Sequence, residues 1–175
     1  DLIPQDRVCL PEFCEKPHEE FDKLIDSGWN KKLTEKQKRD EVYHERLKME
    51  RDVIGKLKME SYMLVCADII RRAREMKIPV GPGRGSVCGS LVAFLMDITQ
   101  IDPIRFNIIF ERFLTADRLS LPDIDMDFGR DGREKVKNAV KELYGEEKFA
   151  AIITYQDWKP RNLIKDIGKV LGRDF

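Results

Sequence analysis

The hydrophobic and polar positions along the chain predict a protein built mainly of helices. From Thr34 to Leu57 the sequence is densely charged, yet its apolar residues recur at the three- and four-residue spacing of one helical stripe. A second stripe of this kind runs from Tyr62 to Met76. Further helices are predicted at 91–98, from Pro103 to Phe113, at 136–143 and at 162–171.

Two other segments predict strands, and together with the helices they indicate an α+β fold class that is helix-rich overall. Residues 119–128 alternate between apolar and polar positions, and residues 149–155 are mostly apolar. These patterns are typical of half-buried and buried strands, respectively. Ile78-Pro79-Val80 predicts a short strand or an extended lead-in to the next segment.

The first 32 residues are predicted to form an irregular N-terminal arm, and residues 33–175 the main domain. Pro4, Pro11 and Pro17 interrupt the mixed sequence of the arm. The charges between Lys36 and Arg51 are interpreted as the solvated face of a helix, with a DNA contact as the less favoured alternative.

Composition narrows the possible classes of protein. The 175 residues include 32 Lys and Arg against 32 Asp and Glu, so the formal net charge is zero. This balance excludes a uniformly basic nucleic-acid-binding surface, although it permits a local patch of either sign. No apolar run approaches the roughly 18 residues that a membrane-spanning helix needs, and no secretory signal is recognisable. The opening Asp1 is expected of a fragment or a processed protein.

Four cysteines without a dense disulfide framework indicate a reduced, intracellular protein, and we expect a cytoplasmic location. Cys9, Cys14 and His18 could form half of a zinc site. No second ligand pair follows at the spacing of a zinc finger or ribbon, so ordinary loop thiols are the preferred interpretation.

Three aspartates carry the clearest chemical signal. Asp123, Asp125 and Asp127 occupy alternate positions of the predicted strand, which places their carboxylates on one face and apolar residues on the other. Neighbouring carboxylates repel one another unless a cation compensates them. Oxygen ligands favour Mg²⁺, and such carboxylates can hold the metal pair used in nucleotidyl transfer. The alternative is an edge strand that carries charges against aggregation.

A glycine-rich segment, Gly81–Ser90, precedes these aspartates. Its glycines permit positive φ angles and close approach of a ligand to the backbone, and the next helix is expected to offer N–H groups at its N-terminus. Arg84 could bind a phosphate with two hydrogen bonds, and Ser86 or Ser90 could cap the helix. The segment matches neither the P-loop nor the dinucleotide-binding signature, so a tight turn is the alternative. Together with the aspartates, it predicts a nucleotide site.

Five motifs follow one another in a fixed order: Val80-Gly-Pro-Gly-Arg-Gly-Ser86, Gly89-Ser-Leu-Val-Ala93, Ile101-Asp-Pro103, Phe110-Glu-Arg-Phe113 and Pro122-Asp-Ile-Asp-Met-Asp-Phe128. In this order they resemble the C-family bacterial DNA polymerases, whose replicative member is the alpha subunit of DNA polymerase III. The resemblance extends from about Leu33 to the end of the chain.

This resemblance implies a partial palm domain over 33–175, with a mixed sheet of the polymerase-beta-like nucleotidyltransferase type and thumb-adjacent helices within 33–77. It implies that Asp123 and Asp125 are catalytic and hold two Mg²⁺ ions, with Asp127 as a supporting metal ligand. The implied activity is that of a replicative DNA-directed DNA polymerase, which adds dNTPs to a primer 3′-hydroxyl by two-metal nucleotidyl transfer.

The resemblance also implies contacts to the nucleotide and to DNA. Gly85 and Ser86 match a pair that contacts the incoming triphosphate, and Arg84 and Arg112 match arginines that line its phosphates. Arg161 stands where relatives carry a lysine, so a weaker contact to DNA or phosphate is expected there. The implied partners are dNTP, primer–template DNA, the remainder of the polymerase chain, the sliding clamp and replisome subunits, with no membrane.

The chain also departs from the pattern of the family. Gln156-Asp-Trp-Lys-Pro160 stands where the family has a turn rich in glycine and threonine, which indicates a divergent or phage-borne relative. The third catalytic aspartate of the family is expected beyond Phe175, so the isolated chain is expected to be inactive. Two alternatives are a non-catalytic nucleotide- or protein-binding module derived from a polymerase palm, and a different nucleotidyltransferase.

Overall fold

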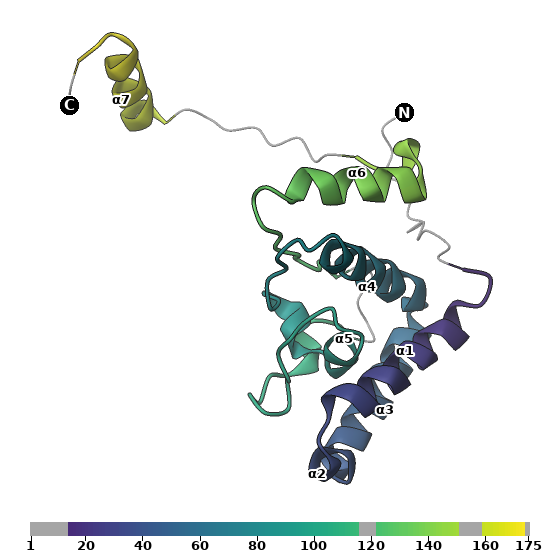
Figure 1. Cartoon of the computed structure of the whole chain (residues 1–175). Helices are drawn as coiled ribbons and strands as arrows, with labels where there is room; N and C mark the ends of the chain where they lie inside the picture. Colours follow the sequence, from purple (N-terminus) through teal and green to yellow (C-terminus); the bar gives the residue numbers. More distant parts are fainter. Residues whose placement is uncertain (1–13, 116–121, 151–158, 174–175) are drawn as a thin grey trace.

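Helices dominate this computed structural model, which describes residues 14–115, 122–150 and 159–173 (Figure 1). In chain order the helices are α1 (Pro17–Lys32), α2 (Glu35–Lys38), α3 (Glu41–Lys56), α4 (Glu60–Glu75), the 3₁₀-helix η1 (Ser86–Gly89), α5 (Leu91–Leu95), the 3₁₀-helix η2 (Phe110–Arg112), α6 (Arg133–Tyr144), the 3₁₀-helix η3 (Glu146–Lys148) and α7 (Pro160–Val170).

The irregular arm predicted for the first 32 residues is wrong from Pro17 onward, because α1 begins there. Proline is tolerated at the first helical position, where its missing N–H would have no partner in any case. Phe21 and Ile25 are buried one turn apart. At Gly28, a Cβ atom would lie 1.9 Å from the carbonyl oxygen of Leu95. The absence of a side chain at Gly28 therefore lets α1 pack closely against α5.

A short break divides the predicted helix 34–57 into α2 and α3. Thr34 caps α2 through reciprocal hydrogen bonds with Gln37. The carboxylate of Asp40 then accepts a 3.1 Å hydrogen bond from the N–H of Val42 and starts α3. Helices α1 and α3 both contact α5, and α1 also contacts α4, so α5 lies at the centre of the core. The largest fully buried apolar side chains include Phe21, Ile25, Ile54, Met63, Leu64, Ile70, Leu91, Phe110, Phe113 and Leu114.

The predicted mixed sheet is wrong, and with it the α+β class and the polymerase-beta-like palm fold. Within the described ranges no strand is formed, and the helix-rich part of the prediction alone agrees with the structure. One isolated antiparallel bridge joins Val80 to Phe128. Of the second predicted strand, residues 151–155 lie outside the described residues, and Phe149 follows η3 without entering a strand.

The bridge does not extend into a ladder, for local reasons. The N–H of Gly81 donates to the carbonyl of Asp127, and the N–H of Gly129 to that of Pro79, both at 2.9 Å. Pro79 has no N–H to return the second bond. On the other side of the bridge, Gly83 has a φ of +105°, which turns the chain out of the extended conformation.

The helix predicted from Pro103 to Phe113 is also wrong, because turns and the short η2 occupy this segment. The carboxylate of Asp102 accepts hydrogen bonds from the N–H groups of Ile104 and Arg105, at 3.0 and 3.3 Å. Asn107 then takes a φ of +51°, which a continuing right-handed helix does not allow.

The remaining predicted helices are confirmed with small shifts of their ends. Helices α4, α6 and α7 match their stripes, whereas α5 stops at Leu95 rather than at residue 98. In α7 the apolar side chains of Ile164, Ile167 and Val170 are exposed. Among the described helices, none combines the length and the apolar character that crossing a membrane requires.

Candidate nucleotide-binding site

The acidic segment 122–128 keeps its alternating pattern without a sheet. Ile124 and Met126 pack against the main core, and Phe128 packs against a second, smaller cluster that includes Val136. The intervening carboxylates face solvent, and the side chain of Asp125 is 52% exposed. Burial of the apolar residues thus turns the aspartates outward, as the period of two in an extended chain requires.

Tyr62 of α4 holds the start of this segment. Its hydroxyl donates a 2.8 Å hydrogen bond to the carbonyl oxygen of Pro122, directly before Asp123. Burial raises the pKa of the Tyr62 phenol well above its usual value, and the neighbouring Cys66 adds to the shift. The phenol therefore keeps its proton and remains a donor across the physiological pH range.

The glycine-rich segment lies directly against the acidic segment. A Cβ atom on Gly81 would lie 3.0 Å from Cβ of Asp127, and a Cβ atom on Gly85 would lie 3.2 Å from Oδ2 of Asp125. Gly85 also has a φ of +73°, which favours glycine. The absence of side chains at Gly81 and Gly85 therefore lets this loop lie close to the aspartates, and the backbone conformation of Gly85 also favours glycine.

Thr99 fixes the other side of the glycine-rich segment. The Thr99 hydroxyl and the N–H of Gln100 both donate to the carbonyl of Pro82, at 2.9 and 2.7 Å. Thr99 is buried, and a Cβ atom at Gly83 would lie only 2.6 Å from its hydroxyl oxygen. The loop is thus held between the core and the acidic segment.

Arg84 lies between two of the aspartates. Its Nε atom is 3.6 Å from Oδ2 of Asp125, and its Nη1 atom is 3.6 Å from Oδ1 of Asp127. These contacts are ion pairs rather than hydrogen bonds, since 3.6 Å exceeds hydrogen-bonding distance. All three side chains are more than half exposed, so the attraction is screened by solvent. Arg84 is a weakly held cation that faces both carboxylates.

The donor chemistry at this position fits a hard divalent cation. Asp125 and Asp127 already direct oxygen atoms toward one positive group, and carboxylate oxygens are the ligands that Mg²⁺ prefers. Among the residues that the structure describes, however, no group of three His, Cys, Asp or Glu side chains could hold a metal ion. Asp123 is therefore not gathered with the other two aspartates around one point.

The remaining predicted nucleotide contacts lie on neighbouring elements. Ser86 begins η1, and Arg112 ends η2 as an exposed residue. The two 3₁₀-helices lie against each other. A Cβ atom at Gly89 would be only 2.6 Å from the carbonyl oxygen of Ile109, which shows how close the two segments are. Arg161 belongs to the first turn of α7, and its side chain is outside the described part of the chain.

The N-terminus of α5 does not offer its N–H groups to a phosphate, contrary to the prediction. Ser90 caps this helix, as its hydroxyl accepts a 3.0 Å hydrogen bond from the N–H of Ala93. The N–H groups of Leu91 and Val92 donate to the carboxylate of Glu50, at 2.8 and 2.9 Å. The anion at this helix terminus is therefore a side chain of the protein itself.

Glu50 was missed because the charged residues 36–51 were all interpreted as a solvated helix face, which is wrong for Glu50. Its side chain is fully buried, and that of its partner Arg46 is 18% exposed. A signal was available in the sequence. Glu50 falls between Leu47 and Ile54 on the apolar stripe of α3, and a charge at such a position requires a buried partner.

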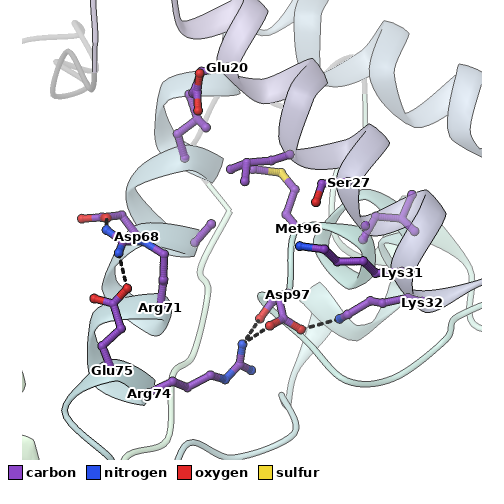
Figure 2. A pocket seen from close by; sticks show the side chains of 15 residues that line it. Glu20, Ser27, Lys31, Lys32, Asp68, Arg71, Arg74, Glu75, Met96 and Asp97 are labelled. Atoms are coloured by element: carbon purple, nitrogen blue, oxygen red, sulfur yellow. Dashed lines mark hydrogen bonds and ion pairs between the residues drawn. The ribbon is translucent and has the colours of Figure 1, made fainter.

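A separate cavity of about 670 Å³ lies between α1, α4 and α5 (Figure 2). None of the predicted site residues lines it. Its charged side chains bind one another: Asp97 contacts Lys32 at 2.5 Å and also pairs with Arg74, while Asp68 pairs with Arg71. The two pairs of Asp97 tie α1 to α4, and Figure 2 shows Asp97 between the two cations, whereas the Asp68–Arg71 pair lies within α4.

The candidate site therefore consists of two carboxylates beside a glycine-rich loop, with an arginine between them. Comparison with known proteins gives the family: residues 19–175 match the family described as the bacterial DNA polymerase III alpha NTPase domain. The chain belongs to this family.

Curated relatives agree with the family match. The chain is 47% identical over 143 residues to the DNA polymerase III subunit alpha of Helicobacter pylori, which covers 82% of this chain and 12% of that protein. It is 42% identical over 168 residues to the protein of the same name from Staphylococcus aureus. This alignment covers 94% of this chain and 16% of the Staphylococcus aureus protein. With the DNA polymerase III subunit alpha of Aquifex aeolicus the identity is 40% over 177 residues. This alignment covers 98% of this chain and 15% of that protein. The chain thus spans less than a fifth of the length of these relatives.

Proposed function

We propose that this chain forms part of the catalytic palm of a replicative DNA-directed DNA polymerase, which adds dNTPs to a primer 3′-hydroxyl. The position of Arg84 between Asp125 and Asp127, beside the glycine-rich loop, carries this proposal. The relatives named DNA polymerase III subunit alpha support it. Those proteins are several times longer, and we expect the complete active site to include residues outside this chain.

The aspartates are proposed to hold the metal ions. Asp123 and Asp125 would be the principal ligands of two Mg²⁺ ions, with Asp127 in support. When bound, such ions activate the attacking hydroxyl and neutralise the triphosphate. The contribution of the chain itself is to present these oxygens on an extended segment whose apolar residues are anchored in the core.

The nucleotide phosphates are proposed to bind at the glycine-rich loop. Gly85 and Ser86 would approach the triphosphate with their backbone, and Arg84 and Arg112 would pair with its oxygens. The present ion pairs of Arg84 are long and solvent-exposed, so turning toward a phosphate costs little. Arg161 is proposed as a further, weaker contact to DNA or phosphate.

The wider context is proposed from the family. The partners are primer–template DNA, the remainder of the polymerase chain, the sliding clamp and other replisome subunits. The setting is the cytoplasm of a bacterium, or of a bacterial host for a phage-borne relative. The domain predicted over 33–175, with thumb-adjacent helices within 33–77, is extended here to include α1, because α1 packs against α4 and α5.

The proposal is tested by primer extension with the complete natural chain and with residues 1–175 alone. We expect Mg²⁺-dependent extension by the complete chain and none by the 175 residues. Robust extension by the short chain would contradict the requirement for further residues. No extension by the complete chain would contradict the polymerase assignment.

A non-catalytic nucleotide-binding module is the second candidate, and one observation favours it: the described acidic side chains do not gather as a metal site. Titration of dNTP with and without Mg²⁺ separates the two functions. A polymerase binds the triphosphate more tightly with the metal present, whereas affinity independent of Mg²⁺ identifies a module that does not use a metal.

A further inference from the structure

Two charged residues of α3 contact the end of the glycine-rich segment from within the core. Glu50 is fully buried, and its carboxylate accepts four hydrogen bonds. The donors are Nε of Arg46 at 2.7 Å, the hydroxyl of Ser90 at 2.8 Å, and the N–H groups of Leu91 and Val92 at 2.8 and 2.9 Å. The junction between the glycine-rich segment and α5 is therefore held by one carboxylate.

Arg46 connects this junction to the next segment. Its Nη2 atom donates to the carbonyl of Gly89 at 2.7 Å and to the carbonyl of Ile108 at 2.9 Å. Its guanidinium also lies 5.9 Å from the centre of the Phe110 ring. One side chain thus joins the end of η1 to the turn that precedes η2.

Stability alone does not account for a charged pair at this place. An isolated buried carboxylate is very costly, and burial raises the pKa of Glu50, against the opposing effect of its hydrogen-bond donors. Replacing a buried ion pair by apolar residues is often neutral or stabilising. The neighbouring stripe positions Leu47 and Ile54 are apolar. The contribution of the pair is directional: four hydrogen bonds define one position for the backbone, which an apolar contact does not.

We propose that Glu50 and Arg46 are positioning residues of the candidate nucleotide site. They set the glycine-rich segment, which carries Arg84 and Ser86, at a defined place relative to η2, which carries Arg112. The assignment of the bound group as a triphosphate rests on the proposed function. The placement of the two segments does not depend on which group binds there, and amide exchange measures it independently of nucleotide addition.

The test compares Glu50→Gln with Glu45→Gln in the complete natural chain. Glutamine has nearly the volume of glutamate, but its side-chain NH₂ group is a hydrogen-bond donor. In place of a carboxylate oxygen, it would face groups that are themselves donors. Glu45 is exposed on the same helix and provides the matched control. We expect Glu50→Gln to raise the KM for dNTP about tenfold and to change kcat by less than about threefold. Amide exchange at Leu91 and Val92 is expected to be about tenfold faster, with α4 unchanged.

A second variant, Arg46→Lys, keeps a positive charge beside Glu50 but lacks the fork that reaches two carbonyls. We expect a rise of about threefold in the KM for dNTP and little change in exchange at Leu91 and Val92. If Glu50→Gln does not fold, Arg46→Lys alone decides, and an unchanged KM then overturns the proposal.

Two results with Glu50→Gln would overturn the positioning role. The first is an unchanged KM in a folded variant. The second is faster exchange throughout the chain, including α4, which would indicate a loss of overall stability. If the unmodified complete chain adds no nucleotide, the proposed function fails, and amide exchange still shows whether Glu50 positions the segment.

Discussion

The guanidinium of Arg84 lies 3.6 Å from the carboxylate of Asp125. The cation thus lies beside Asp125, one of the two aspartates to which the family resemblance assigns metal binding. Because Arg84 also faces Asp127, it compensates two carboxylates that would otherwise repel each other. A metal ion at the aspartates would replace Arg84 as their counter-charge. Arg84 would then be free to turn toward the phosphates of a nucleotide, so we expect metal binding to precede the contact of Arg84 with phosphate.

Asp125→Asn in the complete natural chain is expected to lower nucleotide addition by at least about 10²-fold, since changes outside the direct ligands already cost 10–100-fold at metal sites. Primer extension at saturating dNTP measures this loss. DNA affinity is expected to stay nearly constant because the aspartate does not contact DNA in the proposed site. Asp131→Asn, at an exposed position outside the acidic segment, is the control, and undiminished extension by Asp125→Asn would refute the metal assignment.

Arg84→Ala is expected to raise the KM for dNTP about tenfold, because a hydrogen bond to a charged group contributes about 1.5–3 kcal/mol. The variant also leaves Asp125 and Asp127 without their cation, so Mg²⁺ should bind the free protein more tightly. Steady-state kinetics and a Mg²⁺ titration give the two values. Arg133→Ala, also exposed, should change neither; an unchanged KM with Arg84→Ala would remove this residue from the site.

Two glycines within helices are expected to respond to alanine with opposite signs. Gly28→Ala should destabilise the protein by about 3 kcal/mol, because the new Cβ atom would lie 1.9 Å from the backbone oxygen of Leu95 and would force α1 away from α5. At Gly55 the nearest atom is the flexible end of Glu60 at 3.6 Å, so Gly55→Ala should stabilise α3 by about 0.5–1 kcal/mol. Urea unfolding measures both; equal effects would contradict the close packing of α1 on α5.

Asp68 is expected to make stability depend on acid pH. Burial by itself would raise its pKa, but hydrogen bonds and charges from Arg72 and Arg71 outweigh burial and hold the pKa below its usual range. A group whose pKa is lowered by folding stabilises the protein above its unfolded pKa, and this contribution is lost as the pH falls, from about pH 5 downward. Asp68→Asn should therefore cost about 2 kcal/mol at neutral pH, and less in acid.

Urea midpoints between neutral and acid pH provide the measurement. The control is Asp26→Asn, which changes an exposed residue of α1. Its urea midpoint should change with pH in the same way as that of the unmodified protein. A constant difference between Asp68→Asn and the unmodified protein at every pH would show that the carboxylate charge does not stabilise this part of the fold.

Helical periodicity was sufficient to predict α4, α6 and α7, because the apolar stripe of each helix is a local property of the sequence. It failed at α1, where Phe21 and Ile25 supply a stripe but three nearby prolines suggested an irregular arm. It failed again at Pro103–Phe113, where the positive φ of Asn107 breaks the helix. Strand patterns were less informative, since a sheet needs hydrogen-bonding partners that are distant in the chain.

The sequence by itself determined the chemistry of the site: the alternating aspartates, the glycines that permit close approach, and the family motifs. These features depend on residue type and spacing alone. Only the tertiary structure decided that Arg84 faces Asp125, that the segments meet in one bridge rather than in a sheet, and that Glu50 occupies the N-terminus of α5. The physical reason is that each relationship joins residues about 40 positions or more apart, and burial in a shared core brings such residues together where local propensity does not.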